Sequence, residues 1–319
     1  MRKSLSLSSS IYRGRFAPSP TGPLHFGSLV AAVGSYLDAK HHHGIWLVRM
    51  EDLDTPRCVP GAADDILRTL EAFGLHSDEP ILYQSQRSTA YEEILLKLQT
   101  TDMVYPCCCT RKEIADSAVY GIEGPIYPGT CRKGIPSGRE ERAWRLRTNR
   151  QTIKFDDALQ GHIKQVLETE IGDFVVKRAD GLFAYQLAVV VDDAFQNITH
   201  IARGADLLAS TPRQIHLQHL LGLSTPHYMH FPVAVNEAGE KLSKQTLAAP
   251  VDVSHPARTL LHVLEFLQQR PPASLAKADV KMVLDWAIAN WDAAKMMGIR
   301  TQPTTSKAPP HQPIGKGSV

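Results

Sequence analysis

The stretch that decides the fold is RFAPSPTGPLHFGSLVAAVGSYLDAK, at residues 15–40. It contains three prolines and three glycines, and no charged residue stands between Arg15 and Asp38. This composition excludes a membrane-spanning helix, because prolines, glycines and serines interrupt the apolar run. The prolines instead predict a fixed turn that leads into a helix, which we expect Ser28 to cap.

The residues on either side of this turn fit regular secondary structure. Apolar residues between positions 29 and 37 follow one face of a helix. Arg15–Ala17 fit the end of a strand, and IWLVRM at 45–50 fits a short buried strand. Strand, turn, helix and strand are the opening unit of an α/β fold, so we predict a Rossmann-like, doubly wound parallel sheet.

The rest of the chain divides into further segments. Residues 61–75 and 89–99 are predicted amphipathic helices, and cysteines, glycines and prolines gather from about 105 to 150. Strand-like runs are expected around the Asp-Gly turn within 174–208. The predicted organisation is a flexible leader (1–12), the first half of the sheet domain (13–104), an inserted metal-binding module (105–165), the second half (166–250), a short helical C-terminal region (251–298) and a disordered tail (299–319).

The overall composition is that of an ordinary globular protein. The chain has 319 residues, of which 43% are hydrophobic and 21% charged, with a net charge of +2. This balance neither requires nor excludes a polyanionic partner. The N-terminal sequence MRKSLSLSSSIYR lacks a continuous apolar stretch, so we expect no signal peptide and no membrane partner. Five cysteines are too few for a disulfide scaffold, so we expect the protein in the cytoplasm. We also expect a monomer.

Two short motifs could handle a phosphate group. In PLHFGS, His25 and Gly27 stand where a helix begins, and the N–H groups of a helix N-terminus form an anion site. In KLSKQ, at 241–245, two lysines flank a serine and could neutralise a phosphate chain. Each motif alone also fits a simpler interpretation: a capped surface helix with a solvated histidine, and a solvated charged loop.

The cysteines favour a metal site. Cys107, Cys108 and Cys109 are consecutive, and Cys131 follows after a loop-rich stretch. Three thiolates and one oxygen or nitrogen donor would complete a tetrahedral zinc site. Adjacent side chains seldom converge on one ion, which favours Cys107 and Cys109 over neighbouring pairs. The alternative is a group of reduced structural cysteines, and the three histidines at 41–43 are interpreted as an exposed helix end.

Several motifs together resemble one enzyme family. RFAPSPTG, VRMEDLD, GLFAYQLAVVVDD, RGADLL and KLSKQ follow one another in the order found in the glutamyl-tRNA synthetase group of class I aminoacyl-tRNA synthetases. The resemblance covers about residues 13–250. It implies that the first turn cradles ATP with Mg²⁺. The catalytic residues that it implies are His25, Lys241 and Lys244, and the ATP-binding residues are His25, Gly27, Ser28 and Lys244.

The chain departs from that group in a consistent way. Ser28 replaces a histidine of the first signature, the second signature is KLSKQ, and 74 residues follow Gln245, too few for an anticodon-binding region. These features resemble the glutamyl-Q tRNA(Asp) synthetase branch. That resemblance implies activation of L-glutamate by ATP without tRNA, followed by transfer of glutamate to the queuosine base in the anticodon loop of tRNA(Asp).

The same resemblance implies a glutamate pocket and a zinc site. Arginine side chains suit carboxylates because their planar fork makes paired hydrogen bonds. The implied glutamate-binding residues are Arg15, Phe16, Ala17, Pro18, Ser19, Glu51, Tyr185 and Arg203, with Glu51 facing the ammonium group. One structural Zn²⁺ would be held by Cys107, Cys109, Tyr127 and Cys131. Individually, these arginines could be surface ion pairs, Glu51 a capping carboxylate and Tyr185 a core aromatic.

Two other functions stay open on the sequence alone. The first is a shortened glutamyl-tRNA synthetase, discriminating or non-discriminating, that charges the tRNA 3′ end. The second is a non-catalytic, zinc-containing tRNA-binding protein. Residues 105–150 carry nine Lys or Arg against five Asp or Glu, which fits either a phosphate-contacting surface or a solvated basic face.

Overall fold

A parallel sheet forms the centre of the computed structural model, which describes residues 11–116, 120–121, 124–236, 239–240 and 249–304. Strands β1, β2 and β3 are parallel neighbours in that order, and β11 pairs in parallel with β12. The Thr199 amide donates to the Arg13 carbonyl (3.0 Å), which places the start of β11 beside β1. The predicted parallel α/β sheet is thus confirmed, with strands β1 (Arg13–Phe16), β2 (Ile45–Met50), β3 (Leu82–Tyr83), β11 (His200–Gly204) and β12 (His227–Phe231).

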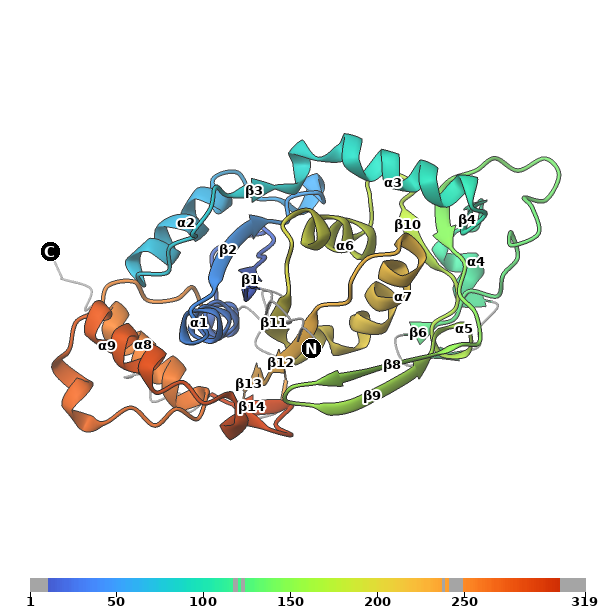
Figure 1. The fold of residues 1–319 in the computed structure, drawn as a ribbon. Helices are drawn as coiled ribbons and strands as arrows, with labels where there is room; N and C mark the ends of the chain where they lie inside the picture. Colours follow the sequence, from blue (N-terminus) through green and yellow to red (C-terminus); the bar gives the residue numbers. More distant parts are fainter. Residues whose placement is uncertain (1–10, 117–119, 122–123, 237–238, 241–248, 305–319) are drawn as a thin grey trace, which may run out of the picture.

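Helices pack against the sheet (Figure 1), and the two largest apolar cores lie between helices and strands. One core joins α1, α2, α8 and α9 to β2, and the other joins α3, α6 and α7 to the inserted strands. Gly34 lets α1 pack closely on β12, because a Cβ there would lie 2.8 Å from the Phe231 ring. The helices are α1 (Phe26–His41), α2 (Ala62–Ala72), α3 (Ser88–Thr100), α6 (Tyr185–Phe195), α7 (Thr211–Leu221), α8 (Pro256–Phe266) and α9 (Val280–Ala289).

Two helix predictions need correction. Helix α1 begins at Phe26, and its N-cap is His25, whose ring accepts a hydrogen bond from the Ser28 amide. Ser28 is therefore inside the first turn and is not the cap. The run at 187–191, expected to be strand-like, forms part of α6 and is buried on all sides of that helix. A short apolar run has no polar positions to reveal its period, so its sequence does not separate a buried helix from a buried strand.

The inserted module, here taken as residues 104–177 so that it includes β4 and β10, has its own antiparallel sheet. Strands β4 (Val104–Cys107), β7 (Ala143–Leu146) and β10 (Phe174–Lys177) pair in the order β10-β7-β4. A small core of cysteine and tyrosine side chains packs beside β4. Shorter elements complete the module, namely α4 (Arg111–Asp116), β5 (Tyr120–Gly121), β6 (Gly124–Pro125) and α5 (Leu167–Glu170).

A long hairpin joins this module to the central sheet. Strands β8 (Thr152–Asp157) and β9 (Gly161–Val166) pair in antiparallel register. Asp157, at the end of β8, pairs with Tyr228 of β12. The hairpin therefore extends along one side of the molecule, as Figure 1 shows in green, with its turn beside the central sheet.

Some residues within the two segments predicted to be flexible have defined contacts. Tyr12 is buried, and its ring stacks on His200 at 3.9 Å between centroids. Near the other end, β14 (Thr301–Pro303) pairs in parallel with β13 (Val233–Val235). Polar and proline-rich composition suggested disorder in both places, but backbone pairing and aromatic stacking order these residues. Within the part of the chain that the structure describes, no helix has the length and apolar character needed to cross a membrane.

Candidate functional site

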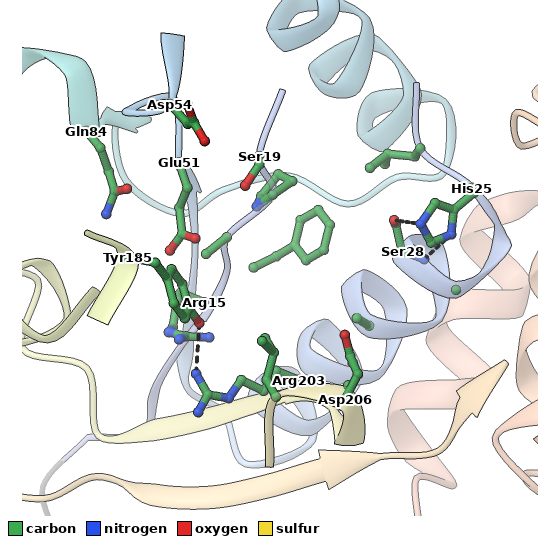
Figure 2. Close-up of a pocket in the computed structure, with 18 of the residues that line it drawn as sticks. Arg15, Ser19, His25, Ser28, Glu51, Asp54, Gln84, Tyr185, Arg203 and Asp206 are labelled. Carbon is green, nitrogen blue, oxygen red and sulfur yellow. Dashed lines mark hydrogen bonds between the residues drawn. The ribbon is translucent and has the colours of Figure 1, made fainter. Parts of the chain in front are cut away.

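A cavity of about 540 Å³ opens where β1, β2 and β11 end. Ligands of open α/β sheets bind at this carboxyl edge of the strands. Figure 2 shows polar side chains from separate parts of the chain directed into this cavity. Its lining includes eleven residues expected from the sequence, namely Arg15, Phe16, Ala17, Pro18, Ser19, His25, Gly27, Ser28, Glu51, Tyr185 and Arg203.

The proline-containing turn after β1 forms one wall of the cavity. Its backbone is fixed to the neighbouring chain, because the Pro18 carbonyl accepts from the Glu51 amide and the Pro20 carbonyl accepts from the Val59 amide, both at 2.9 Å. Prolines restrict the backbone and donate no N–H of their own, so the turn presents a preformed surface to a ligand. This arrangement explains why the stretch is uncharged and rich in proline.

His25 closes the first turn of α1 at the other side of the cavity. Its Nδ1 accepts from the Ser28 amide (3.2 Å), so Nε2 carries the proton and donates to the Ser28 hydroxyl (3.1 Å). A Cβ at Gly27 would lie 3.3 Å from the His25 ring. The start of α1 therefore has a small, backbone-lined surface at which an anion can approach the helix.

The KLSKQ motif lies outside the described residues, and so do Lys241 and Lys244. Its two flanks are described. On the C-terminal side, Pro250 forms a bridge with His25, and the Val251 amide donates to the Leu24 carbonyl (2.9 Å). On the N-terminal side, Ala234 of β13 lines the cavity. Described residues on both sides of the motif, Ala234 and Pro250, therefore lie at the cavity or beside His25.

Arg15 and Glu51 belong to a buried ionic network. Asp193 of α6 accepts from Arg15 Nε (2.9 Å) and from Arg49 Nη1 (2.8 Å), and Arg49 Nη2 lies 3.3 Å from Glu51 Oε1. Burial opposes the charge on Asp193, but the two guanidinium groups hold the pKa of its carboxyl below the ordinary value. Burial raises the pKa of Glu51 despite Arg49 and Arg15. A cation in the cavity would stabilise the charged form of Glu51 and so counteract the effect of burial on its pKa.

Arg203 is held by a different set of partners. Its Nη1 donates to the Tyr185 hydroxyl (3.1 Å), as Figure 2 shows. Its Nη2 donates to Thr211 Oγ1 (2.7 Å) and Gln214 Oε1 (2.8 Å), and its Nε donates to His230 Nε2 (3.1 Å). Burial raises the pKa of Tyr185, so its hydroxyl keeps its proton. The two cavity arginines are thus both oriented by neighbours within the protein.

Sequence reasoning missed the residues that stand behind this lining. They are Arg49, Asp193, Thr211, Gln214 and His230, together with Asp54, Arg57, Gln84, Arg178 and Asp206 on the cavity wall. One signal was available for Asp193. The pair of aspartates in VVVDD follows an apolar run, and buried carboxylates require charged or hydrogen-bonding partners. The other residues become neighbours only through folding.

Three of the predicted metal ligands converge in the inserted module. The sulfur atoms of Cys107, Cys109 and Cys131 lie within 4.8 Å of one another. The Tyr127 hydroxyl lies 3.4 Å from Cys107 Sγ and 3.6 Å from Cys109 Sγ. Cys108 Sγ approaches Cys131 Sγ (3.4 Å) but does not belong to the converging set. A cluster of this kind can hold a metal ion, since soft thiolates suit zinc and related metals.

The protonation of this cluster depends on its neighbours. Burial opposes a thiolate at Cys131, but hydrogen bonds from the Cys108 amide and the Tyr127 hydroxyl lower its pKa to about 7. Burial and the neighbouring sulfur atoms raise the pKa of Tyr127. A bound cation would be needed to remove the tyrosine proton. The remaining cysteine, Cys58, contacts the Asp52 carbonyl instead.

Comparison with known proteins agrees with this architecture. The family model for the catalytic domain of class I tRNA synthetases (E and Q) matches residues 12–259. The chain is 62% identical to a glutamyl-Q tRNA(Asp) synthetase of Dechloromonas aromatica over 88% of this chain and 94% of that protein. A protein of the same name from Chromobacterium violaceum is 56% identical, over 91% of this chain and 97% of its own.

Solved structures show the same fold in a longer protein. The crystal structure of a glutamate-tRNA synthetase from Elizabethkingia anophelis superimposes with a TM-score of 0.75 at 24% identity, covering 93% of this chain and 68% of that one. A glutamate tRNA ligase from Elizabethkingia meningosepticum, in complex with its amino acid, gives a TM-score of 0.73 at 26% identity. Together with the identity to the full-length relatives, the matching catalytic domain shows that this chain belongs to the glutamyl-Q tRNA(Asp) synthetase family.

Proposed function

We propose that the chain activates L-glutamate with ATP in the absence of tRNA and then transfers glutamate to the queuosine base in the anticodon loop of tRNA(Asp). The observation that carries this proposal is the single cavity in which Arg15, Arg203 and Glu51 meet the His25 end of α1. Glutamate brings two carboxylates and one ammonium group, and this set of side chains offers opposite charges to all three. The names of the most similar relatives support the same reaction.

The first step joins glutamate to the α-phosphorus of ATP. A glutamate α-carboxylate oxygen attacks that phosphorus, the new P–O bond forms, and the bond to pyrophosphate breaks. Arg15 and Arg203 are proposed to hold the carboxylates, and Glu51 to hold the ammonium group. No covalent bond to the protein is required, so catalysis rests on positioning and charge stabilisation. An ammonium group beside Glu51 would favour the charged form of its carboxyl and would counteract the burial that raises its pKa.

The phosphates are proposed to lie against the first turn of α1. The Ser28 amide is occupied by His25 Nδ1, and the donating His25 Nε2 and the backbone at Gly27 remain close to the cavity. Lys241 and Lys244 would add positive charge from the segment whose flanks reach this point. Mg²⁺ bound with ATP supplies further neutralisation of the phosphate charge. In the second step, a hydroxyl of the modified base attacks the glutamyl carbonyl carbon and AMP leaves.

The inserted module is proposed to hold one structural Zn²⁺. Cys107, Cys109, Tyr127 and Cys131 would supply four donors, which closes a tetrahedral site and leaves no position for a substrate. Reduced thiols of this kind persist in the cytoplasm, where we place the reaction. We also propose that a monomer is active, since one chain by itself brings Arg15, Glu51 and Arg203 together in the cavity.

The decisive test is glutamate-dependent exchange of pyrophosphate into ATP without tRNA. The proposed activity predicts exchange, and a binding-only protein predicts none. The second assay compares transfer of labelled glutamate to tRNA(Asp) with and without queuosine. Dependence on the modified base supports the proposal. Glutamate transfer that does not need queuosine and that ends at a tRNA 3′ end would instead identify a shortened glutamyl-tRNA synthetase.

A further inference from the structure

We propose that His230 is a positioning residue that fixes the guanidinium of Arg203 in the cavity, with Asp157 holding the histidine in the required tautomer. This inference rests on the proposed function only for its kinetic test. His230 is fully buried on β12 and does not line the cavity. It can therefore affect a ligand only through the residues that it contacts.

The hydrogen bonds around His230 define its protonation. Arg203 Nε always carries a proton and donates to His230 Nε2 (3.1 Å), so Nε2 must be the unprotonated nitrogen. His230 Nδ1 lies 2.5 Å from Asp157 Oδ2 and donates to it. The ring is thus neutral, with its proton on Nδ1. Burial lowers the pKa of His230 to about 4, which agrees with a neutral ring at physiological pH.

Asp157 is well placed to enforce that tautomer. Its Oδ1 accepts from the amides of Leu159 (3.1 Å), Gln160 (2.9 Å) and His230 (3.2 Å), which leaves Oδ2 for the imidazole. Burial opposes the charge, but the His230 hydrogen bond and these amides lower the pKa of Asp157. The carboxylate accepts hydrogen bonds only, so it requires a proton on His230 Nδ1. The turn of the β8–β9 hairpin is thereby connected to the cavity through one imidazole.

A neutral histidine has a specific consequence for Arg203. Arg15 faces the carboxylate of Asp193, whereas the direct hydrogen-bond partners of Arg203 are neutral: Tyr185, Thr211, Gln214 and His230. Among the described residues, no carboxylate forms a hydrogen bond or ion pair with Arg203. Its positive charge therefore remains available for a carboxylate ligand. An aspartate or glutamate in place of His230 could also accept from Arg203, but it would neutralise the guanidinium and would place a second carboxylate beside Asp157.

Three variants test the positioning role in the exchange assay. His230→Leu removes the acceptor, leaves the Arg203 Nε–H without its partner, and is expected to raise the KM for glutamate about tenfold to a hundredfold. The KM for ATP should change less than about twofold. His230→Gln retains an acceptor oxygen and should restore much of the glutamate KM. His227→Gln, on the same strand but exposed, is the matched control and should behave as the parent.

Equal rises in both KM values, or a parental glutamate KM for His230→Leu, would contradict the role of His230. If the His230→Leu variant does not fold, the tautomer of His230 in the parent protein still tests the proposal. ¹⁵N NMR of histidine-labelled protein should show a neutral His230 with a protonated Nδ1, and a protonated Nε2 or an imidazolium ring would overturn the proposal. Absence of exchange by the parent protein would instead remove the proposed function, while the NMR result would remain valid.

Discussion

Asp193 connects the arginine side chains beside the cavity. It receives hydrogen bonds from two arginines, and one of them, Arg49, also contacts Glu51. Arg49 is completely buried, and its Nε has no hydrogen-bond partner among the described residues. Such a network is costly to desolvate and is maintained by mutual pairing. Removing one member should disturb the position of the others.

Asp193→Asn is therefore expected to raise the glutamate KM about tenfold or more, because Arg15 loses its charged partner. The control is Asp192→Asn on the neighbouring position of α6, where the carboxylate pairs with Arg87 and Tyr91. It should destabilise the protein with a smaller effect on the glutamate KM. Exchange kinetics give the glutamate KM of each variant, and urea unfolding gives its stability. Equal glutamate KM values for Asp193→Asn and Asp192→Asn would contradict the role assigned to Asp193.

Lys244 belongs to the proposed phosphate site, although it lies outside the described residues. Loss of one charge-stabilising contact commonly lowers a rate by about 10²–10³. Lys244→Ala should therefore lower exchange by that factor while the melting temperature stays unchanged. Lys277→Ala, at an exposed position in the C-terminal region, controls for loss of a positive charge. Exchange at the parental rate by the Lys244 variant would exclude its participation.

At the scale of elements, the inserted module is organised around its cysteines. Arg145 Nε approaches Cys107 Sγ (3.2 Å), and its guanidinium lies 3.9 Å from the centre of the Tyr127 ring. Five of the nine basic residues in 105–150 bond or stack within the protein, namely Arg132, Arg139, Arg145, Arg147 and Arg150. Much of the local positive charge is thus structural, which weakens the expectation of a basic surface devoted to phosphate contacts.

The predicted metal site includes Cys131 but not Cys58, so variants at the two positions should differ in metal content. Purified protein should contain about one zinc per chain, and Cys131→Ser should lose it because a converging thiolate is removed. Cys58→Ser should retain the metal, since Cys58 lies apart from the cluster. Elemental analysis measures the content, and chelation should lower the melting temperature because structural zinc contributes to folding, by ~10–16 kcal/mol in small peptides. Zinc retention by Cys131→Ser would contradict the proposed ligand set.

At the scale of the whole molecule, the cavity is a product of distant segments. Its walls come from the turn after β1, the end of β2, the start of α6 and the end of β11. The C-terminal strand β14 then pairs with β13, whose Val233 and Ala234 line the cavity. Segments from both halves of the chain, between residues 15 and 84 and between residues 178 and 234, must therefore come together before the cavity exists.

Stability should depend on pH through two buried carboxylates. The pKa values of Asp157 and Asp193 are lower in the folded protein than in an unfolded chain, whose aspartates titrate near pH 3.9. The folded state binds fewer protons, so their stabilisation is present above that value and is lost as the pH falls. Urea unfolding should show a decline from about pH 5 downward. The decline should be smaller for Asp193→Asn, and an equal decline would exclude this carboxylate as its cause.

The sequence by itself determined the class of fold and much of the cavity lining. The period of apolar residues marked α1, α2 and α3, and the motif order pointed to one family. Eleven of the residues that this resemblance implied line one cavity, while Lys241 and Lys244 lie outside the described residues. The tertiary structure alone decided that α6 is a helix, that Tyr12 and 301–303 are ordered, and that His230 reaches Arg203. The physical reason is that periodicity and motif chemistry are local properties of the chain. Burial and side-chain pairing depend on residues brought together from far apart in sequence.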